Sequence, residues 1–113
     1  MTSSDQDLDS LLLHKKNLLF DFYGALLTER QKLVFAMRYM EDSSLAEIGL
    51  ALGITTQAVV DFLKRIDKRL EMFENKLGLV AKFQANKAIL ARLRNQIPDS
   101  DSDLIELIEG LQI

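Results

Sequence analysis

Five side chains in one stretch of the sequence have the chemistry needed to bind a nucleic acid. Thr56 and Gln57 stand at the expected start of a helix, where the Gln57 amide can pair with the edge of an adenine. Three basic residues further along the same helix can contact phosphates: Lys64, Arg65 and Lys68. About three phosphate contacts give weak, salt-sensitive binding, and a dimer would double them.

Three neighbouring residues do not fit that chemistry. Asp61 repels phosphate and is suited only to accepting a hydrogen bond from a cytosine amino group. Val60 and Phe62 cannot both face the core, because successive residues of a helix are about 100° apart. One of them would therefore meet another surface, and an exposed apolar residue at such a place favours a protein contact. Val60 and Phe62 are candidate protein contacts, as are Phe73 and Leu77 further along.

The elements that must position these residues are two helices joined by a short turn. Residues 45–59 have the spacing of a helix-turn-helix, the motif that places its second helix in the major groove of DNA. Gly49 is small enough to let the second helix cross closely, and Gly53 suits the left-handed residue that ends the first helix. Thr55 or Thr56 can cap the second helix. Its inner face would be buried through Val59, Leu63 and Ile66.

Apolar residues recur at three- and four-residue steps along most of the chain, which predicts further helices. The expected helices are 8–27, Glu29 to about Met40, about Leu45 to Leu52, one that begins near Thr56, and Leu79 to about Gln96. Thr28 and Gln31 have the pattern of a capping box at the start of the second helix. Asp42, Ser43 or Ser44 can cap the third. The second helix would bury Leu33, Val34 and Met37.

The apolar residues also follow a heptad rhythm from Val59 to Val80, over about three repeats. This rhythm predicts a coiled-coil-like seam against another helix, of the same chain or of a partner. Gly78 interrupts it, so either two helices or one continuous bent helix can follow. Residues 98–102 are a polar linker. Residues 103–111 are either a disordered tail or a short amphipathic helix docked on a surface.

The composition favours one helical domain. The 113 residues include one proline and five glycines, are rich in good helix formers, and suffice for one hydrophobic core. We expect an all-α fold: a three-helix core with a helix-turn-helix and no wing, extended by long C-terminal helices. Within the single domain 1–113, the core would span about 28–73 and the helical extension about 56–97. The acidic linker and the amphipathic segment would span 98–113.

Several classes of chemistry lack the residues that they need. The chain has no cysteine and one histidine, His14, so neither a disulfide framework, a His/Cys metal site nor a histidine-based nucleophile triad can be built. The carboxylates form no motif, and a Gly-rich phosphate loop is absent. We therefore expect no enzyme, no cofactor or metal, and no small-molecule substrate.

The charge is unevenly distributed along the chain. Bases outnumber acids in residues 56–96, whereas residues 98–113 carry acidic charges only, within a net charge of -3. The basic stretch can pair with the acidic one, meet phosphates, or form a solvated helix face. The N-terminus lacks the features of a signal peptide, and no apolar segment approaches the roughly 20 residues that cross a bilayer. We expect a soluble cytoplasmic protein without membrane contact.

The order of residues from Thr28 to about Phe73 resembles region four of bacterial sigma factors, whose helix-turn-helix reads promoter DNA. The matching residues are Thr28-Glu29-Arg30-Gln31, Leu45-Ala46-Glu47-Ile48-Gly49, Leu52-Gly53-Ile54, Ala58-Val59, Leu63-Lys64-Arg65 and Leu70. With Leu19-Phe20-Asp21-Phe22-Tyr23 before them and Glu74-Asn75-Lys76-Leu77 after them, the stretch from Leu18 to Pro98 is similar to the YlxM family. One departure is that sigma recognition helices typically follow their buried valine with basic and small polar residues, whereas Val60, Asp61 and Phe62 stand here.

The resemblance implies a small DNA-binding regulator with a sigma-like helix-turn-helix. Genes of the YlxM family commonly lie beside those of the signal recognition particle GTPase and its receptor, which implies a role in that targeting pathway.

Three hypotheses follow. The first is a regulator that binds DNA through the five residues named first. The second is a non-enzymatic adaptor that binds the RNA or the GTPase of the signal recognition particle and depends on Val60 and Phe62. The third is a structural homodimer whose long helices pack across a two-fold axis at Phe73 and Leu77, and dimerisation is compatible with the other two.

Overall fold

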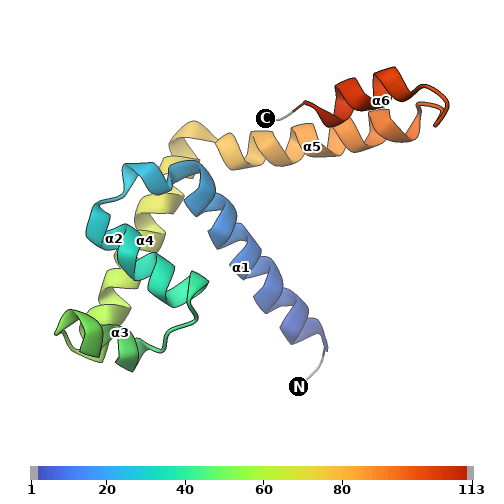
Figure 1. The fold of residues 1–113 in the computed structure, drawn as a ribbon. Helices are drawn as coiled ribbons and strands as arrows, with labels where there is room; N and C mark the ends of the chain where they lie inside the picture. The colour runs from blue at the N-terminus through green and yellow to red at the C-terminus, as the bar shows by residue number, and fades with distance from the viewer. Residues whose placement is uncertain (1–2, 112–113) are drawn as a thin grey trace. The chain divides into compact units, whose positions relative to one another are not determined.

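The computed structural model describes residues 3–111, and the side chains of residues 7–111. Its α-helices are α1 (Ser3–Tyr23), α2 (Glu29–Phe35), α3 (Leu45–Leu52), α4 (Thr56–Leu77), α5 (Leu79–Asn95) and α6 (Ser102–Glu109) (Figure 1). A 3-10 turn, Gly24–Leu26, follows α1, and a π-helical turn, Ala36–Met40, follows α2. No strand occurs between residues 3 and 111. The expected all-α class is therefore confirmed.

The chain divides into two compact units, Met1–Leu77 and Gly78–Ile113. Gly78 has a φ of +63°, a left-handed conformation that glycine adopts without a β-carbon clash. The heptad pattern is therefore divided between two helices, α4 and α5, and the alternative of one continuous bent helix is wrong. The assignment of the whole chain to a single domain stays a prediction.

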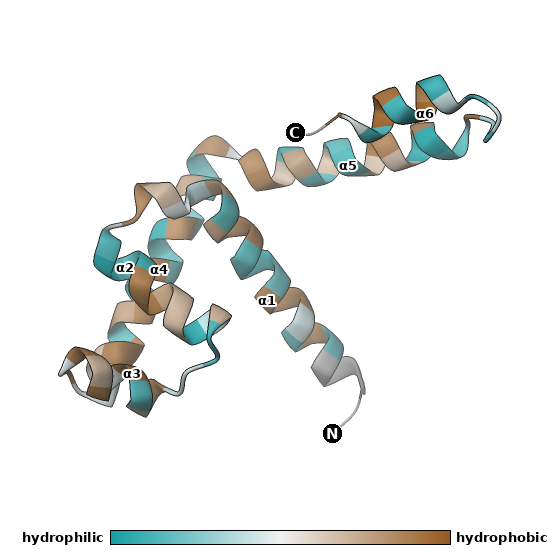
Figure 2. Cartoon of the chain, in the orientation of Figure 1, coloured by the Kyte–Doolittle hydropathy of each residue, from teal (hydrophilic) through white to brown (hydrophobic). Residues whose placement is uncertain are grey.

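The core of the first unit lies where α4 meets α1, α2 and α3. Val59, Leu63, Ile66 and Leu70 are buried along the inner face of α4, as the spacing predicts. The other elements of the unit bury Leu19, Tyr23, Leu27, Val34, Phe35 and Ile48 against it. Figure 2 shows apolar and polar segments alternating along α1, which is typical of a helix that is buried on one side only.

One expectation about burial and one about the start of a helix are wrong. Leu33 is 49% exposed, because the fully buried Val34 and Phe35 fix the inner side of α2 and leave Leu33 on the outer side. α1 begins at Ser3 rather than near residue 8, and its leucines between residues 8 and 13 are exposed. Among the side chains of α1 that the structure describes, residues 7–23, those of the C-terminal half pack on the core.

Polar contacts tie that half of α1 to its neighbours. The Tyr23 hydroxyl donates to Oε1 of Glu74 at 2.5 Å. Lys16 Nζ donates to Tyr39 Oη at 2.8 Å and to Oδ2 of Asp67 at 3.4 Å. Burial lowers the pKa of Lys16, but the Tyr39 hydrogen bond and the Asp67 carboxylate outweigh it and leave the pKa raised. The Lys16 ammonium therefore joins α1, the π-helical turn and α4 in its charged form.

The second unit is a pair of helices, α5 and α6. Asp101 caps α6 by accepting from the Leu104 N–H at 3.4 Å. Arg94 of α5 lies 3.5 Å from Asp99 and 3.7 Å from Glu109, measured from guanidinium nitrogen to carboxylate oxygen. The segment after the polar linker is thus a helix docked on α5, and the alternative of a disordered tail does not apply to the residues that are described. Between residues 3 and 111, no single helix is both long and apolar enough to cross a membrane.

Candidate nucleic-acid interface

Two capping boxes fix where α2 and α3 begin. Thr28 Oγ1 accepts from the Gln31 N–H at 3.1 Å while the Gln31 side chain accepts from the Thr28 N–H at 3.0 Å, which confirms the predicted box. Ser44 and Glu47 make the same reciprocal pair at the start of α3, both at 3.0 Å. Ser44 is therefore the cap among the three candidates. Hydrogen bonds with Ser44 lower the pKa of Glu47 because they favour the carboxylate. The bond with the Ser44 backbone has the larger effect and the one with its side chain the smaller.

The turn after α3 depends on two glycines. Gly53 has a φ of +69°, which confirms the predicted left-handed C-cap. The N–H groups of Gly53 and Ile54 both donate a hydrogen bond to the carbonyl oxygen of Gly49, and the bond from Ile54 is 2.9 Å long. A β-carbon at Gly49 would lie 2.7 Å from the carbonyl oxygen of Ile54. Gly49 is therefore needed because the turn folds back onto α3. The predicted reason, close crossing by the second helix, is not the one that the structure shows.

Thr55 completes the turn by accepting from the Ala58 N–H at 3.0 Å, so Thr55 is the cap and Thr56 is the first residue of α4. α3 and α4 meet at an angle of 100°. Two helices joined by three or four residues at about 90–120° are the geometry of a helix-turn-helix. The predicted motif is confirmed in its elements and its angle.

The structure places all five predicted nucleic-acid residues on the exposed surface of α4: Thr56, Gln57, Lys64, Arg65 and Lys68. At about 100° per residue, Gln57, Lys64 and Lys68 point away from the buried stripe, and Arg65 lies at the edge of that outward face. Gln57 Nε2 donates to Oδ1 of Asp61 at 3.1 Å. Gln57, which is expected to pair with an adenine, is therefore oriented by Asp61, whose carboxylate is expected to repel phosphate.

Three of the four candidate protein contacts are half-buried, and the fourth is exposed. Val60 and Phe62 are both half-buried, because they lie on opposite flanks of α4. The ring of the half-buried Phe73 lies 5.9 Å from that of Tyr23, within the same unit. Leu77, the last residue of α4, is 56% exposed. A protein contact through any of these four residues stays a prediction.

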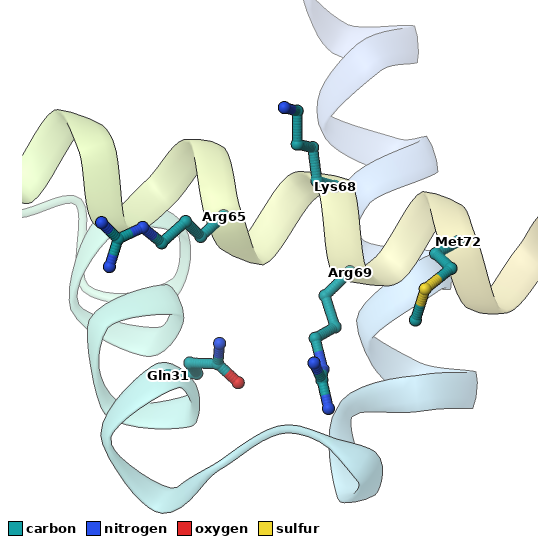
Figure 3. Close-up of a pocket in the computed structure, with 5 residues that line it drawn as sticks. All are labelled: Gln31, Arg65, Lys68, Arg69 and Met72. Atoms are coloured by element: carbon teal, nitrogen blue, oxygen red, sulfur yellow. The ribbon is translucent and has the colours of Figure 1, made fainter.

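A depression of about 340 Å³ lies between α2 and α4, and we call it the α2–α4 pocket. It is lined by Gln31 of α2 and by Arg65, Lys68, Arg69 and Met72 of α4 (Figure 3). An adjoining depression of about 220 Å³ shares Arg65 with it and is lined besides by Arg30, Ile54, Ala58, Asp61 and Phe62.

Sequence reasoning missed Arg30 and Arg69 as candidate site residues. Arg69 follows Arg65 by four residues and so falls on the same flank of α4, a signal that the helical spacing already contained. For Arg30 the sequence held no such signal, because only the folded chain brings α2 beside α4. Among the residues that the structure describes, neither of these arginines, nor Arg65 or Lys68, is ion-paired with a carboxylate. This flank can therefore attract an anion.

The geometry of α3, its turn and α4 defines a helix-turn-helix protein. Residues 13–110 match the model of the UPF0122 family, described as "Putative helix-turn-helix protein, YlxM / p13 like", and the chain belongs to this family. The predicted resemblance to the YlxM family is confirmed.

Relatives of the same family are similar over most of the chain. A UPF0122 protein of Thermoanaerobacter sp. (strain X514) is 43% identical over 99 residues, which cover 83% of this chain and 85% of the relative. A UPF0122 protein of Desulforamulus reducens is 46% identical, with 88% and 83% covered. A UPF0122 protein of Halalkalibacterium halodurans is 39% identical, with 86% and 91% covered.

Proposed function

We propose that the protein is a cytoplasmic DNA-binding regulator that inserts the outward face of α4 into the major groove and catalyses no reaction. The observation that carries this proposal is the angle of 100° between α3 and α4 together with exposed polar and basic side chains on α4. In such a helix pair the second helix lies in the major groove while the first crosses the DNA backbone. Membership of a helix-turn-helix family supports the same function.

Contacts to bases and to phosphates would come from different parts of α4. Gln57 and Asp61 lie one turn apart near the N-terminus of the helix, where base edges are usually read, and both offer oxygen acceptors. Such acceptors suit the amino groups of adenine and cytosine. Lys64, Arg65 and Lys68 follow as phosphate contacts, which position the helix but carry no sequence preference.

The test is a fluorescence-polarisation titration of a random DNA duplex at two salt concentrations. The three phosphate contacts of Lys64, Arg65 and Lys68 contribute about -2.7 to the log–log slope, hence roughly 40-fold weaker binding at about 200 mM than at about 50 mM salt from these contacts alone. The variant Lys64→Gln/Arg65→Gln/Lys68→Gln should lose most of the binding and most of the slope. The matched control removes the same charge from exposed positions of α5: Lys82→Gln, Lys87→Gln and Arg92→Gln. Retained binding in the first variant, or equal loss in the control, would contradict the proposed surface.

A second candidate is an adaptor of the signal recognition particle, in which the same fold holds its RNA or its GTPase. The position of Phe62 in the depression beside Arg30 and Ile54 favours a protein contact there. The same titration with the RNA of the particle, and co-purification with the GTPase, test this function. Loss of co-purification in Phe62→Ala but not in the triple charge variant would favour the adaptor over the DNA regulator.

We further propose that the protein acts as a homodimer, which would double its phosphate contacts. The heptad pattern that leads to Leu77 supports this, because that side chain is 56% exposed at the end of α4 and a heptad seam is suited to a second helix. Light scattering should give the mass of a dimer for the unaltered protein and of a monomer for Leu77→Asp. Met40→Asp, at a site 59% exposed, is the control. A monomer in the unaltered protein contradicts the dimer.

A further inference from the structure

We propose that the α2–α4 pocket binds a backbone phosphate of a nucleic acid, so that α2 contributes to the interface beside α4. This inference rests on the proposed nucleic-acid-binding function and deepens it, because it assigns a second element and further residues to the contact.

The first argument is that α4 separates its charges between two flanks. The acidic residues of its second half all contact α1: Asp67 lies 3.4 Å from Lys16 and Glu71 lies 3.6 Å from Lys15, and Glu74 accepts from a tyrosine of α1. The flank that faces α2 carries arginines instead. Two carboxylates of α4 thus pair with lysines of α1, whereas Arg65, Lys68 and Arg69, which have no carboxylate partner among the described residues, line the α2–α4 pocket.

The second argument is that the polar groups lining the pocket are hydrogen-bond donors. Gln31 uses its side-chain oxygen to accept from the Thr28 N–H at 3.0 Å, so its amide nitrogen is left to donate. Guanidinium and ammonium groups donate and never accept. The lining of the α2–α4 pocket includes no carboxylate. A surface that offers donors only fits an anion with several acceptor oxygens, as a phosphate has.

The third argument is that Arg69 is already supported on one side. Its guanidinium lies over the ring of Phe73, 5.7 Å from the centroid, in a cation–π contact. In Figure 3 the Gln31 side chain lies between those of Arg65 and Arg69, while the Lys68 side chain points away from them. Arginine suits this place because its planar group can hold a phosphate with two hydrogen bonds.

The adjoining depression extends the contact along the same flank. Arg30 of α2 lies there with Arg65, which both depressions share. Asp61 also lines it and would oppose a phosphate at that end, so the phosphate is placed in the α2–α4 pocket itself. Arg30 comes from α2 whereas Asp61 comes from α4, so Arg30 would meet a neighbouring phosphate of the same strand on the α2 side of this depression.

The decisive variant is Gln31→Glu. A glutamate at this position completes the capping box with Thr28 as well as a glutamine does, so the fold is kept. It replaces a donor by a negative charge beside Arg65 and Arg69. Affinity for a random DNA duplex at about 50 mM salt should fall fivefold or more, since one repulsive unit charge near a phosphate changes binding by about that factor. Circular dichroism should show an unchanged helix content and an equal or higher thermal midpoint.

A second variant tests the charge without touching the cap. Arg30→Gln/Arg69→Gln removes two phosphate contacts, so the magnitude of its log–log salt slope should be smaller by about 1.8 than that of the unaltered protein. The weakening of its binding between about 50 and 200 mM salt should therefore be roughly tenfold smaller. Lys82→Gln/Lys87→Gln, from α5, is the control of equal charge and should keep the original slope. Arg69→Lys should keep it as well, because the charge remains.

The outcomes separate this proposal from the function on which it rests. Binding that depends on Lys64, Arg65 and Lys68 but is unchanged in Gln31→Glu and Arg30→Gln/Arg69→Gln leaves the function standing and overturns the pocket. Failure of the unaltered protein to bind any duplex overturns both. An RNA duplex of equal length distinguishes the two sources of phosphate, and equal loss with both supports a contact to the shared backbone. Displacement of the duplex by inorganic phosphate beyond that by chloride of equal ionic strength supports a site for phosphate groups. Binding of inorganic phosphate with no loss of duplex affinity in Gln31→Glu would instead assign the pocket to the free anion.

Discussion

Replacing Gly49 by alanine should destabilise the protein, although alanine is the better helix former. In the middle of a helix alanine is favoured over glycine by about 1 kcal/mol. Here the new β-carbon would lie 2.7 Å from the Ile54 carbonyl oxygen, closer than carbon and oxygen can approach. That oxygen cannot easily move, because the Ile54 N–H is bonded to the carbonyl of Gly49 itself at 2.9 Å. Overpacking of this kind costs about 1–3 kcal/mol, so we expect a net loss of roughly 1 kcal/mol and at most about 2 kcal/mol.

Thermal unfolding followed by circular dichroism measures this effect. A loss of roughly 1 kcal/mol lowers the midpoint by roughly 4–8 °C. Leu50→Ala is the control, since that side chain is 87% exposed in the same helix and its removal should change the stability by no more than about 0.5 kcal/mol. A midpoint of Gly49→Ala equal to or above that of the unaltered protein would refute the reasoning, because helix propensity would then outweigh the contact in the turn.

Two further predictions concern charge. Asp61→Asn removes a negative charge from the outward face of α4 but leaves an oxygen that accepts from Gln57. Affinity for a random duplex should therefore rise about fivefold, the equivalent of about 1 kcal/mol. Unchanged affinity in polarisation titrations would place this part of α4 away from the nucleic acid. Glu47→Gln tests the second capping box through its pH dependence. The pKa of Glu47 is lowered in the folded protein, so its carboxylate stabilises the fold above the unfolded pKa of about 4.3 and this contribution is lost as the pH falls through the lower, folded value. The difference in thermal midpoint between the two proteins should therefore be present at pH 7 and vanish toward pH 3, and a constant difference would assign the effect to something other than this charge.

Local signals in the sequence suffice for the helix-turn-helix. A capping pair such as Thr28 and Gln31 acts within four residues, and the left-handed turn at Gly53 depends on one residue, so both can be predicted without the fold. The inner face of α4 follows from spacing alone, from Val59 to Leu70. The angle between α3 and α4 is then set by a turn whose residues are all visible in the sequence.

Contacts between distant parts of the chain could not be predicted in the same way. The spacing in α2 allows either Leu33 or Phe35 on the inner side, and only the stacking of Phe35 on Phe20, with ring centroids 4.2 Å apart, decides between them. Arg30 becomes a neighbour of Arg65 only once α2 lies along α4. Both outcomes depend on tertiary packing, which overrides helical periodicity.

α4 holds the first unit together with one side and presents its proposed binding residues on the other. Because substitutions at exposed helix positions usually change stability by less than about 0.5 kcal/mol, the outward positions can vary while the buried stripe stays the same. A set of variants at Gln57, Asp61 and Lys64 could thus be selected for a new target sequence without re-engineering the fold. Retargeting of this kind would change only the outward positions of α4 and leave the rest of the first unit as it is.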